Sequence, residues 1–278
     1  MGSKIKKYIK KLCHTVTSKE MSILPANIAF YFVLALIPII TITIVIASHF
    51  SITIDLVIDL INNIIPSPIS DTIVEIISGK GFDSNVGIFN LIAFFVATNG
   101  THAIVNVSNT LYKVEENDFI RDRIKATILL LIIVILLVFM LFVPLFGDKI
   151  LSFIKEIDIL SNIIDEIIFV FNLIKWPLTF LIIYFNLKLI YTIAPSTNIK
   201  SQDTTYGAFF TAILWMIVSA IFSYYLKYFG NYDILYGNLS SLIILMIWIY
   251  AISYIFVLGM AINVTKFDNK KEIKEHNK

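Results

Sequence analysis

The chain has 278 residues, and 58% of them are hydrophobic while only 15% are charged. Together with a mean hydropathy of +0.83, this composition excludes an ordinary soluble globular protein and predicts a membrane protein. The formal net charge is only +2, so the distribution of charge matters more than its total. The single cysteine, Cys13, excludes an internal disulfide and a cysteine-based metal cluster.

Residues 1–20 are expected to form a basic amphipathic segment in the cytoplasm. Six lysines lie among apolar residues at a spacing that suits a helix resting on an anionic leaflet, and a pure topology signal is the alternative. No further basic module follows, so nucleic acid is not an expected partner. The first apolar run begins near Ile28 and ends without a cleavage motif, which predicts that it stays in the mature protein.

Six apolar stretches predict an all-α, polytopic transmembrane helix bundle in residues 21–265. The last stretch is the most distinct, because Ile234 to Thr265 contains no Asp, Glu, Lys or Arg and its centre is apolar on every side. A bilayer core of about 30 Å needs about 20 such residues, folded as a helix. The six spans are expected at about 27–49, 86–108, 126–147, 176–193, 204–226 and 240–263, followed by a charged cytoplasmic tail at 266–278.

Amphipathic segments separate some of these spans. Residues 51–78 have the pattern of two short helices around Pro66-Ser-Pro68, and residues 149–166 have the pattern of a third. We expect these to be interfacial helices outside the cell, either packed on the bundle or acting as a lid.

The orientation of the chain in the membrane follows from the distribution of the basic residues. With the N-terminus inside, 17 of the 22 Lys and Arg lie on the cytoplasmic side, which predicts that both termini are cytoplasmic.

The second span carries the best polar constellation in the chain. Asn99, His102, Asn106 and Asn109 are spaced 3, 4 and 3 apart and so share one helical face. The functional interpretation is a polar lining for a translocation path or a headgroup site, and the structural alternative is interhelical hydrogen bonding. His102 is the ionisable residue that we expect deepest in a span, where it could titrate near neutral pH.

Further candidate residues come from the other spans, and each has a structural alternative. Asn27 and Tyr31 are four apart and are candidates to face the second-span stripe, or only to pack. Lys175, beside Trp176-Pro177, is a candidate for binding a phosphate at the outer leaflet or a plain interfacial anchor. Tyr224 and Tyr228 belong to a four-residue repeat that indicates an aromatic belt or a surface guiding a headgroup.

Signatures of catalysis are absent from the sequence. The four histidines are not at metal-ligand spacing, and there is no HExxH motif, no phosphate-binding loop and no nucleophile elbow. We therefore predict no catalytic residues, no metal, no cofactor and no enzymatic activity. A ribonuclease function in particular would need a carboxylate cluster or paired histidines, and the sequence offers neither.

Several short motifs occur in an order that resembles one known family. They are Tyr236-Gly237-Asn-Leu-Ser-Ser, Trp248-Ile-Tyr250, Gly259-Met-Ala-Ile-Asn263, Leu24-Pro25 to Tyr31 with Pro38, Asn99 to Tyr112, Lys175-Trp-Pro177, Tyr191 with Pro195, and Gly207 with Trp215. Over roughly residues 10 to 265 the chain resembles the YihY/BrkB family of bacterial inner-membrane proteins, formerly described as ribonuclease BN. One position departs, because the family often has an acidic residue where this chain has Ala261.

The resemblance implies a bacterial cytoplasmic-membrane protein linked to serum resistance, envelope integrity and a proposed transport role. Our first hypothesis is a transporter or flippase-like translocator of an amphiphilic or lipid-linked substrate. The alternative is a non-transporting scaffold for envelope integrity that binds other membrane proteins. Expected partners are the lipid bilayer, including anionic lipid headgroups, and either a second copy of the chain or envelope proteins.

Overall fold

The fold was obtained as a computed structural model, which describes residues 10, 13–14, 16–48, 55, 58–59, 61–62, 70–71, 74, 86–114, 118–155, 164–229 and 240–276. The regular structure of these residues is helical, so the all-α class predicted from the sequence is confirmed. The long helices are α2 (Lys19–Ser48), α5 (Val86–Leu111), α6 (Phe119–Lys155), α7 (Ile164–Ile193), α8 (Thr205–Phe229) and α10 (Ser240–His276).

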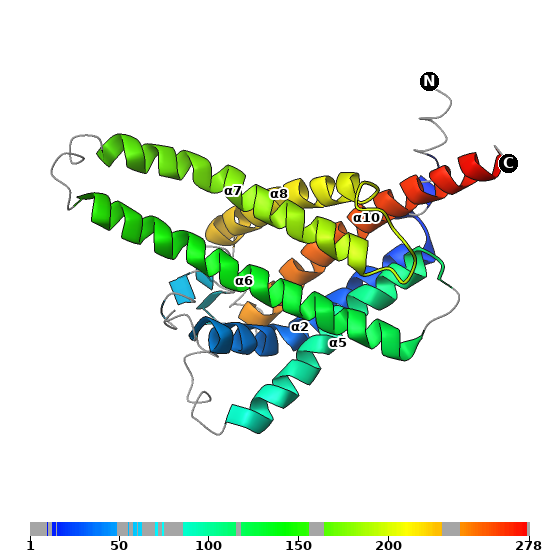
Figure 1. Ribbon diagram of the computed structural model, residues 1–278, viewed down its shortest axis with the longest axis horizontal. Coiled ribbons are helices and arrows are strands. Elements are labelled where there is room, and N and C mark those ends of the chain that lie inside the picture. Colours follow the sequence, from blue (N-terminus) through cyan, green and yellow to red (C-terminus); the bar gives the residue numbers. More distant parts are fainter. Residues whose placement is uncertain are drawn as a thin grey trace.

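The six long helices run alternately in opposite directions, and α6 and α7 lie side by side along most of their length (Figure 1). This alternation brings two connections and the last turns of α10 to one end of the bundle. We call this region, residues 109–114, 118–125, 194–206 and 263–268, the polar end. Two contacts tie it together: the rings of Tyr112 and Phe267 are 5.6 Å apart, and Lys125 Nζ donates to the carbonyl oxygen of Pro195 at 2.7 Å.

Three of these helices are long and apolar enough to cross a membrane within the described part of the chain. The apolar segments are Lys19–Leu36 in α2, Thr205–Lys227 in α8 and Leu242–Asp268 in α10, with a shorter one at Pro177–Ile193 in α7. The helices extend beyond the predicted spans. The first begins at Lys19 rather than near residue 27, α7 begins at Ile164 rather than near 176, and α10 continues helically to His276 through the predicted tail.

The amphipathic segment predicted at residues 149–166 is not a separate helix. Its first part, through Lys155, is the end of α6, and its last residues, from Ile164, are the start of α7, while 156–163 lie outside the described residues. The two short helices predicted in 51–78 lie mostly outside the described residues.

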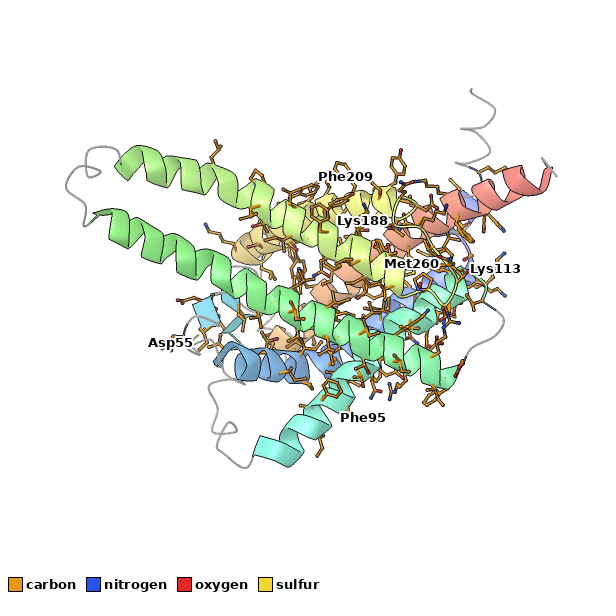
Figure 2. All side chains as sticks on the ribbon, in the orientation of Figure 1. Asp55, Phe95, Lys113, Lys188, Phe209 and Met260 are labelled. Carbon is orange, nitrogen blue, oxygen red and sulfur yellow. The ribbon has the colours of Figure 1, made fainter. Side chains whose placement is uncertain are left out.

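Side chains from all six helices form the main core. The largest fully buried ones include Ile28 of α2, Leu129 of α6, Tyr191 of α7 and Met260 of α10. The outer surface is also apolar: Figure 2 shows Phe209 on the outside of the bundle and Met260 among the helices, and Phe95 is 60% exposed. Helices that are apolar both inside and outside need an apolar solvent, which is what a bilayer provides.

The C-terminus of α5 is closed by a turn with a left-handed residue, Lys113, whose φ is 52°. The amide of Val114 donates to the carbonyl of Asn109 at 3.0 Å, and the amide of Lys113 donates to that of Thr110 at 3.2 Å. This pair of bonds is the Schellman motif, in which glycine is the preferred residue at the left-handed position. A lysine there strains the backbone by about 1 kcal/mol.

Replacing Lys113 with glycine is therefore expected to stabilise the fold. The relief of backbone strain exceeds the entropy that glycine loses on folding, and we expect a gain of about 0.5 kcal/mol. Thermal unfolding of the purified protein in one detergent measures it. The control is Lys113→Ala, which removes the same charge but keeps the strain, so an equal gain in that variant would show that charge and not backbone conformation is responsible.

Candidate functional site

The predicted polar stripe of α5 is divided between two environments. Asn99, His102 and Asn106 do lie along one side of the helix, where Asn106 is exposed and the other two are half-buried. Asn109, by contrast, is only 1% exposed and is turned into the polar end of the bundle. Three residues of the stripe are thus at the outer surface of α5, and the fourth belongs to an internal network.

Arginine 123 of α6 joins the outer three residues. Its Nη2 donates to Oδ1 of Asn99 at 2.9 Å, and its guanidinium carbon lies 5.0 Å from the centre of the Phe95 ring. Next to it, Nδ2 of Asn106 and Nδ1 of His102 are 3.3 Å apart. The imidazole also packs edge-on against Phe119, with 6.2 Å between ring centres. We call Asn99, His102, Asn106 and Arg123 the α5–α6 polar face.

The depth of this face follows from the way the two antiparallel helices pair. Thr101 Oγ1 donates to the carbonyl oxygen of Ala126 at 2.7 Å, which places these two residues at the same level. His102 then lies level with the first turns of α6, which contain Arg121, Arg123 and Lys125. Three cations within two turns are too costly for the hydrocarbon core. His102 therefore lies level with this cationic start of α6, and its depth in a membrane stays a prediction.

The direction of the Arg123 side chain is unusual for this position. A cationic side chain near the end of a span normally extends outward to the headgroups. Arg123 instead reaches toward Asn99 and Phe95, which are farther along α5 from the polar end than the Thr101–Ala126 level. Its guanidinium is therefore directed away from the polar end, toward the middle of α5.

An open groove runs along α6 beside this guanidinium. It has a volume of about 420 Å³ and is lined by Phe119, Ile120, Arg123, Ile124, Thr127 and Ile128. Apart from Arg123 and Thr127 these residues are apolar, and Ile120 is 68% exposed. The surface therefore combines one cationic group, several polar donors and an apolar trough open to the outside.

The internal network at the polar end is built on the buried carboxylate of Asp122. One oxygen accepts from Ser196 Oγ at 2.5 Å and the other accepts from Asn109 Nδ2 at 3.0 Å. The amide of Ser196 donates to Asn109 Oδ1 at 2.7 Å. Lys125 Nζ donates to Ser196 Oγ at 3.1 Å and so brings a positive charge to the same cluster. These bonds fasten the end of α5, the start of α6 and the segment after α7 to one another.

Burial shifts the titration of two groups at this end. It lowers the pKa of Lys125, an effect to which the positive charge of Arg121 adds and which the carboxylate of Asp122 opposes. Burial also raises the pKa of the Tyr112 phenol, and the carboxylates of Asp203 and Asp268 raise it further. Tyr112 therefore stays neutral over the physiological range.

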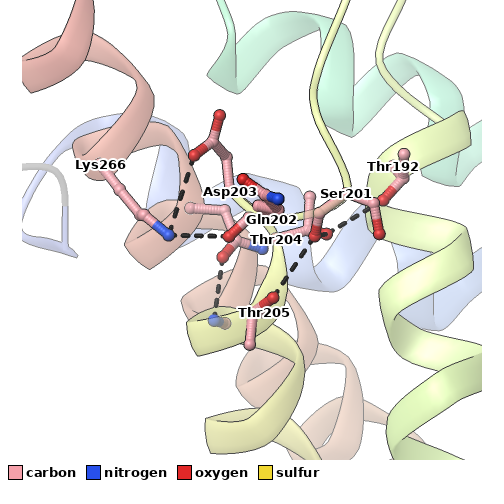
Figure 3. Close-up of polar contacts among 9 residues, drawn as sticks. Thr192, Ser201, Gln202, Asp203, Thr204, Thr205 and Lys266 are labelled. Carbon is pink, nitrogen blue, oxygen red and sulfur yellow. Dashed lines mark hydrogen bonds and ion pairs between the residues drawn. The ribbon is translucent and has the colours of Figure 1, made fainter.

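A second polar cluster at this end holds α10 against the start of α8 (Figure 3). Lys266 Nζ donates to the carbonyl oxygen of Gln202 at 2.8 Å and lies 3.8 Å from the Asp203 carboxylate. The same ammonium is 4.4 Å from the centre of the Tyr206 ring. Thr204 immediately precedes α8, and its carbonyl accepts from the amide of Ala208 at 3.0 Å. These contacts fix the geometry of the bundle rather than offer an open site.

The tightest helix contact is between α8 and α10, with α7 beside it. The amide of Gly207 donates to Oδ1 of Asn263 at 2.9 Å, and a methyl group on Gly207 would overlap the carbonyl oxygen of Gly259. Tyr191 donates from its hydroxyl to the carbonyl oxygen of Phe256 at 2.7 Å. Trp215 Nε1 donates to the carbonyl oxygen of Ile252 at 2.8 Å.

The remaining predicted site residues do not join the α5–α6 polar face. Asn27 and Tyr31 are exposed on α2, and within the described part of the chain no hydrogen bond or ring contact links them to the α5 stripe. Tyr224 is exposed on α8. Lys175 lies within α7 and Tyr228 within α8, but their side chains are outside what the structure describes. Their proposed roles stay predictions.

Comparison with known proteins assigns the chain to a family. The model of the family described as virulence factor BrkB matches residues 12–278. The chain belongs to the virulence factor BrkB family. It is 29% identical to the ribonuclease-like protein YfkH of Bacillus subtilis, over 95% of this chain and 96% of YfkH. No solved structure matches the chain.

Shorter matches connect the chain to the UPF0761 membrane proteins. The protein from Citrobacter koseri is 33% identical over 112 residues, which are 40% of this chain and 36% of that protein. The protein from Haemophilus influenzae strain Rd is 37% identical over 79 residues, which are 28% of this chain and 29% of that protein. The chain is accordingly a membrane protein with several candidate spans.

Several motifs by which the chain resembles other BrkB family members are helix contacts in the structure. Tyr191, Gly207, Trp215, Gly259 and Asn263 all lie at the α7–α8–α10 contact. Ala261 is fully buried in the main core. It stands at the position where the family resemblance predicts an acidic residue.

Sequence reasoning missed Arg123, Asp122 and Ser196. The first two look like ordinary loop charges next to Arg121, and the hydrogen-bonding partners Asp122 and Ser196 are 74 residues apart.

Proposed function

We propose that this BrkB family protein moves an amphiphilic or lipid-linked molecule across the bacterial cytoplasmic membrane. In this proposal six helices span the bilayer and both termini are cytoplasmic. The support is the alternating direction of the six long helices, which returns the end of α10 to the same end of the bundle as the start of α2 (Figure 1). The predicted excess of Lys and Arg on this side makes it the cytoplasmic one.

The observation that carries the transport proposal is the α5–α6 polar face and its groove. A path for a fully polar solute needs an enclosed, water-filled interior. Here the polar donors instead sit at the outer surface, beside an apolar trough that is open to the lipid. Such a surface suits a molecule whose headgroup follows polar side chains while its tail remains in the bilayer.

We propose no enzymatic activity, including the ribonuclease activity that the name of YfkH suggests for that protein. Among the described residues, no three His, Cys, Asp or Glu side chains gather in a cluster that could hold a metal ion. Asp122, the buried carboxylate of the polar end, is held by Asn109 and Ser196 and is almost inaccessible.

The test of transport is leaflet exchange in liposomes. The purified full chain is reconstituted with labelled phosphatidylglycerol, and an impermeant quencher reports the fraction of label in the outer leaflet. We expect exchange several-fold faster than in empty liposomes, and slower exchange with His102→Ala. Exchange equal to that in empty liposomes would contradict the proposal and favour the scaffold hypothesis, which predicts stable co-purifying envelope proteins instead.

A further inference from the structure

We propose that the α5–α6 polar face is a binding site for the phosphate of an anionic phospholipid from the cytoplasmic leaflet, with Arg123 as its anchor and the groove on α6 holding an acyl chain. The inference deepens the proposed function and rests on its placement of the polar end at the cytoplasmic surface. It names both the chemical class of the ligand and the residues that select it.

The donor capacity of Arg123 is the first argument. A guanidinium has five N–H donors in a planar fork, and one of them, on Nη2 of Arg123, donates to Asn99 Oδ1. Within the described part of the chain, Arg123 has no carboxylate partner. A positive charge directed toward the apolar side of the boundary is costly without an anion, and a phosphate accepts two parallel bonds from the fork.

The neighbouring carboxylates do not fill this role. Asp122, next to Arg123 in sequence, is buried on the other side of α6, where both of its oxygens accept hydrogen bonds. Asp118 begins α6, and its side-chain oxygen accepts from the amide of Ile120 at 3.0 Å. The electrostatic complement of Arg123 must therefore come from outside the described residues.

Two further polar side chains extend the site along α5. When Asn106 Nδ2 donates to His102 Nδ1, the neutral imidazole carries its proton on Nε2 and keeps a donor for a ligand. His102 is half-buried and Asn106 is exposed, so both are reachable from the lipid side. Asn99 orients the guanidinium of Arg123 by accepting a hydrogen bond from it. The face thus presents donors and one cation, which is the pattern that a phosphate requires.

The groove accounts for the rest of the ligand. Ile120, Ile124 and Ile128 are spaced by four and line it on the exposed side of α6, over a rise of about 12 Å. It extends from Phe119 and Ile120 at the start of α6, past Arg123, to Thr127 and Ile128, where the uncharged part of α6 begins. The part beyond Arg123 matches the order of groups in a phospholipid, with the phosphate beside Arg123 and the chain along Ile124 and Ile128.

The test measures lipid binding directly, without transport. The purified full chain is exchanged with short-chain phosphatidylglycerol or phosphatidylcholine, and native mass spectrometry gives the dissociation constant of each bound lipid. We expect phosphatidylglycerol to bind more tightly, and Arg123→Gln to weaken it about tenfold, the effect of losing one charge-assisted contact. Arg121→Gln, which removes the same charge from an exposed position two residues away and so on another side of the helix, is expected to change binding less than twofold.

Two more arms complete the design. Arg123→Lys keeps the positive charge but loses the planar fork of donors. This variant should bind phosphatidylglycerol with an affinity between those of the wild type and Arg123→Gln. Inorganic phosphate should displace the lipid only at far higher concentration, because it lacks the chain that fills the groove. Equal losses in Arg121→Gln and Arg123→Gln, or unchanged binding in Arg123→Gln with its melting temperature preserved, would overturn the site. Displacement by phosphate and by lipid at similar concentrations would overturn the role of the groove.

The outcomes separate this inference from the proposed function. If liposomes show leaflet exchange but Arg123→Gln binds lipid normally, transport stands and this site fails. If exchange is absent but binding depends on Arg123, the site stands and the protein is a lipid-binding scaffold.

Discussion

Gly207→Ala is expected to destabilise the protein by about 3 kcal/mol, the largest effect that we predict for a single methyl group. The added carbon would overlap the Gly259 carbonyl oxygen and Asn263 Oδ1. The first is backbone, so α8 and α10 must move apart. That movement also lengthens the hydrogen bond from the Gly207 amide to Asn263. Thermal unfolding of the purified protein in detergent measures the loss.

The matched control adds one heavy atom elsewhere on the same helix. Ala220→Ser changes an exposed position of α8 and should shift the melting temperature little. Gly259→Ala should behave like Gly207→Ala, since its methyl would meet Thr211 Oγ1, the Tyr191 hydroxyl and the Gly207 carbonyl. Similar melting temperatures for Gly207→Ala and Ala220→Ser would mean that the two helices are not in close contact.

Asp122→Ala is expected to cost about 3 kcal/mol, by a different mechanism. The substitution removes the carboxylate that accepts from Asn109 Nδ2 and from Ser196 Oγ, while Asn109 Nδ2 keeps its 3.2 Å bond to Ser196 Oγ. It also removes the nearby negative charge from Lys125. Asp122→Asn keeps one oxygen acceptor and should lose less. Chemical denaturation followed by tryptophan fluorescence gives the free energies.

The control for the carboxylate is Asp59→Ala, at an exposed position, for which we expect a change within about 0.5 kcal/mol. The α5–α6 and α7–α8 connections should also become accessible to protease in Asp122→Ala and not in Asp59→Ala. If the two variants unfold at the same denaturant concentration, the buried network contributes nothing to holding the polar end together.

The sequence predicted the helices well because apolar runs are long and local. The predicted ends of the helices were less accurate. Helices such as α7 and α10 continue into amphipathic or charged residues, and a search for apolar membrane spans stops where such residues begin. The spacing of Asn99, His102 and Asn106 placed them correctly on one side of α5. Which neighbour that side meets depends on how α6 packs, and the pattern of one helix carries no information about it.

The same reason explains the missed residues. Arg123 and Asp122 are consecutive, yet one reaches Asn99 at the outer surface and the other reaches Asn109 inside the polar end. Their directions differ only because successive residues of a helix point to different sides, so that the cation is half-buried at the surface of α6 and the anion is fully buried. Two adjacent charged residues in a sequence usually indicate a solvated loop. Ser196, the partner of Asp122, is too distant in the sequence for a local pattern to predict the contact.

The central claim is that the α5–α6 polar face lies at the membrane boundary and not among acyl chains. Collision measurements on spin labels test it, in the background Cys13→Ser, which removes the one native cysteine. Single labels at Asn106→Cys and at Ile135→Cys, an exposed site farther along α6, are compared in lipid bilayers. We predict that a polar nickel chelate reaches the label at 106 and that oxygen, which concentrates in hydrocarbon, favours the label at 135. An oxygen-rich, chelate-excluded label at 106, matching the one at 135, would contradict both the placement of this face and the lipid site built on it.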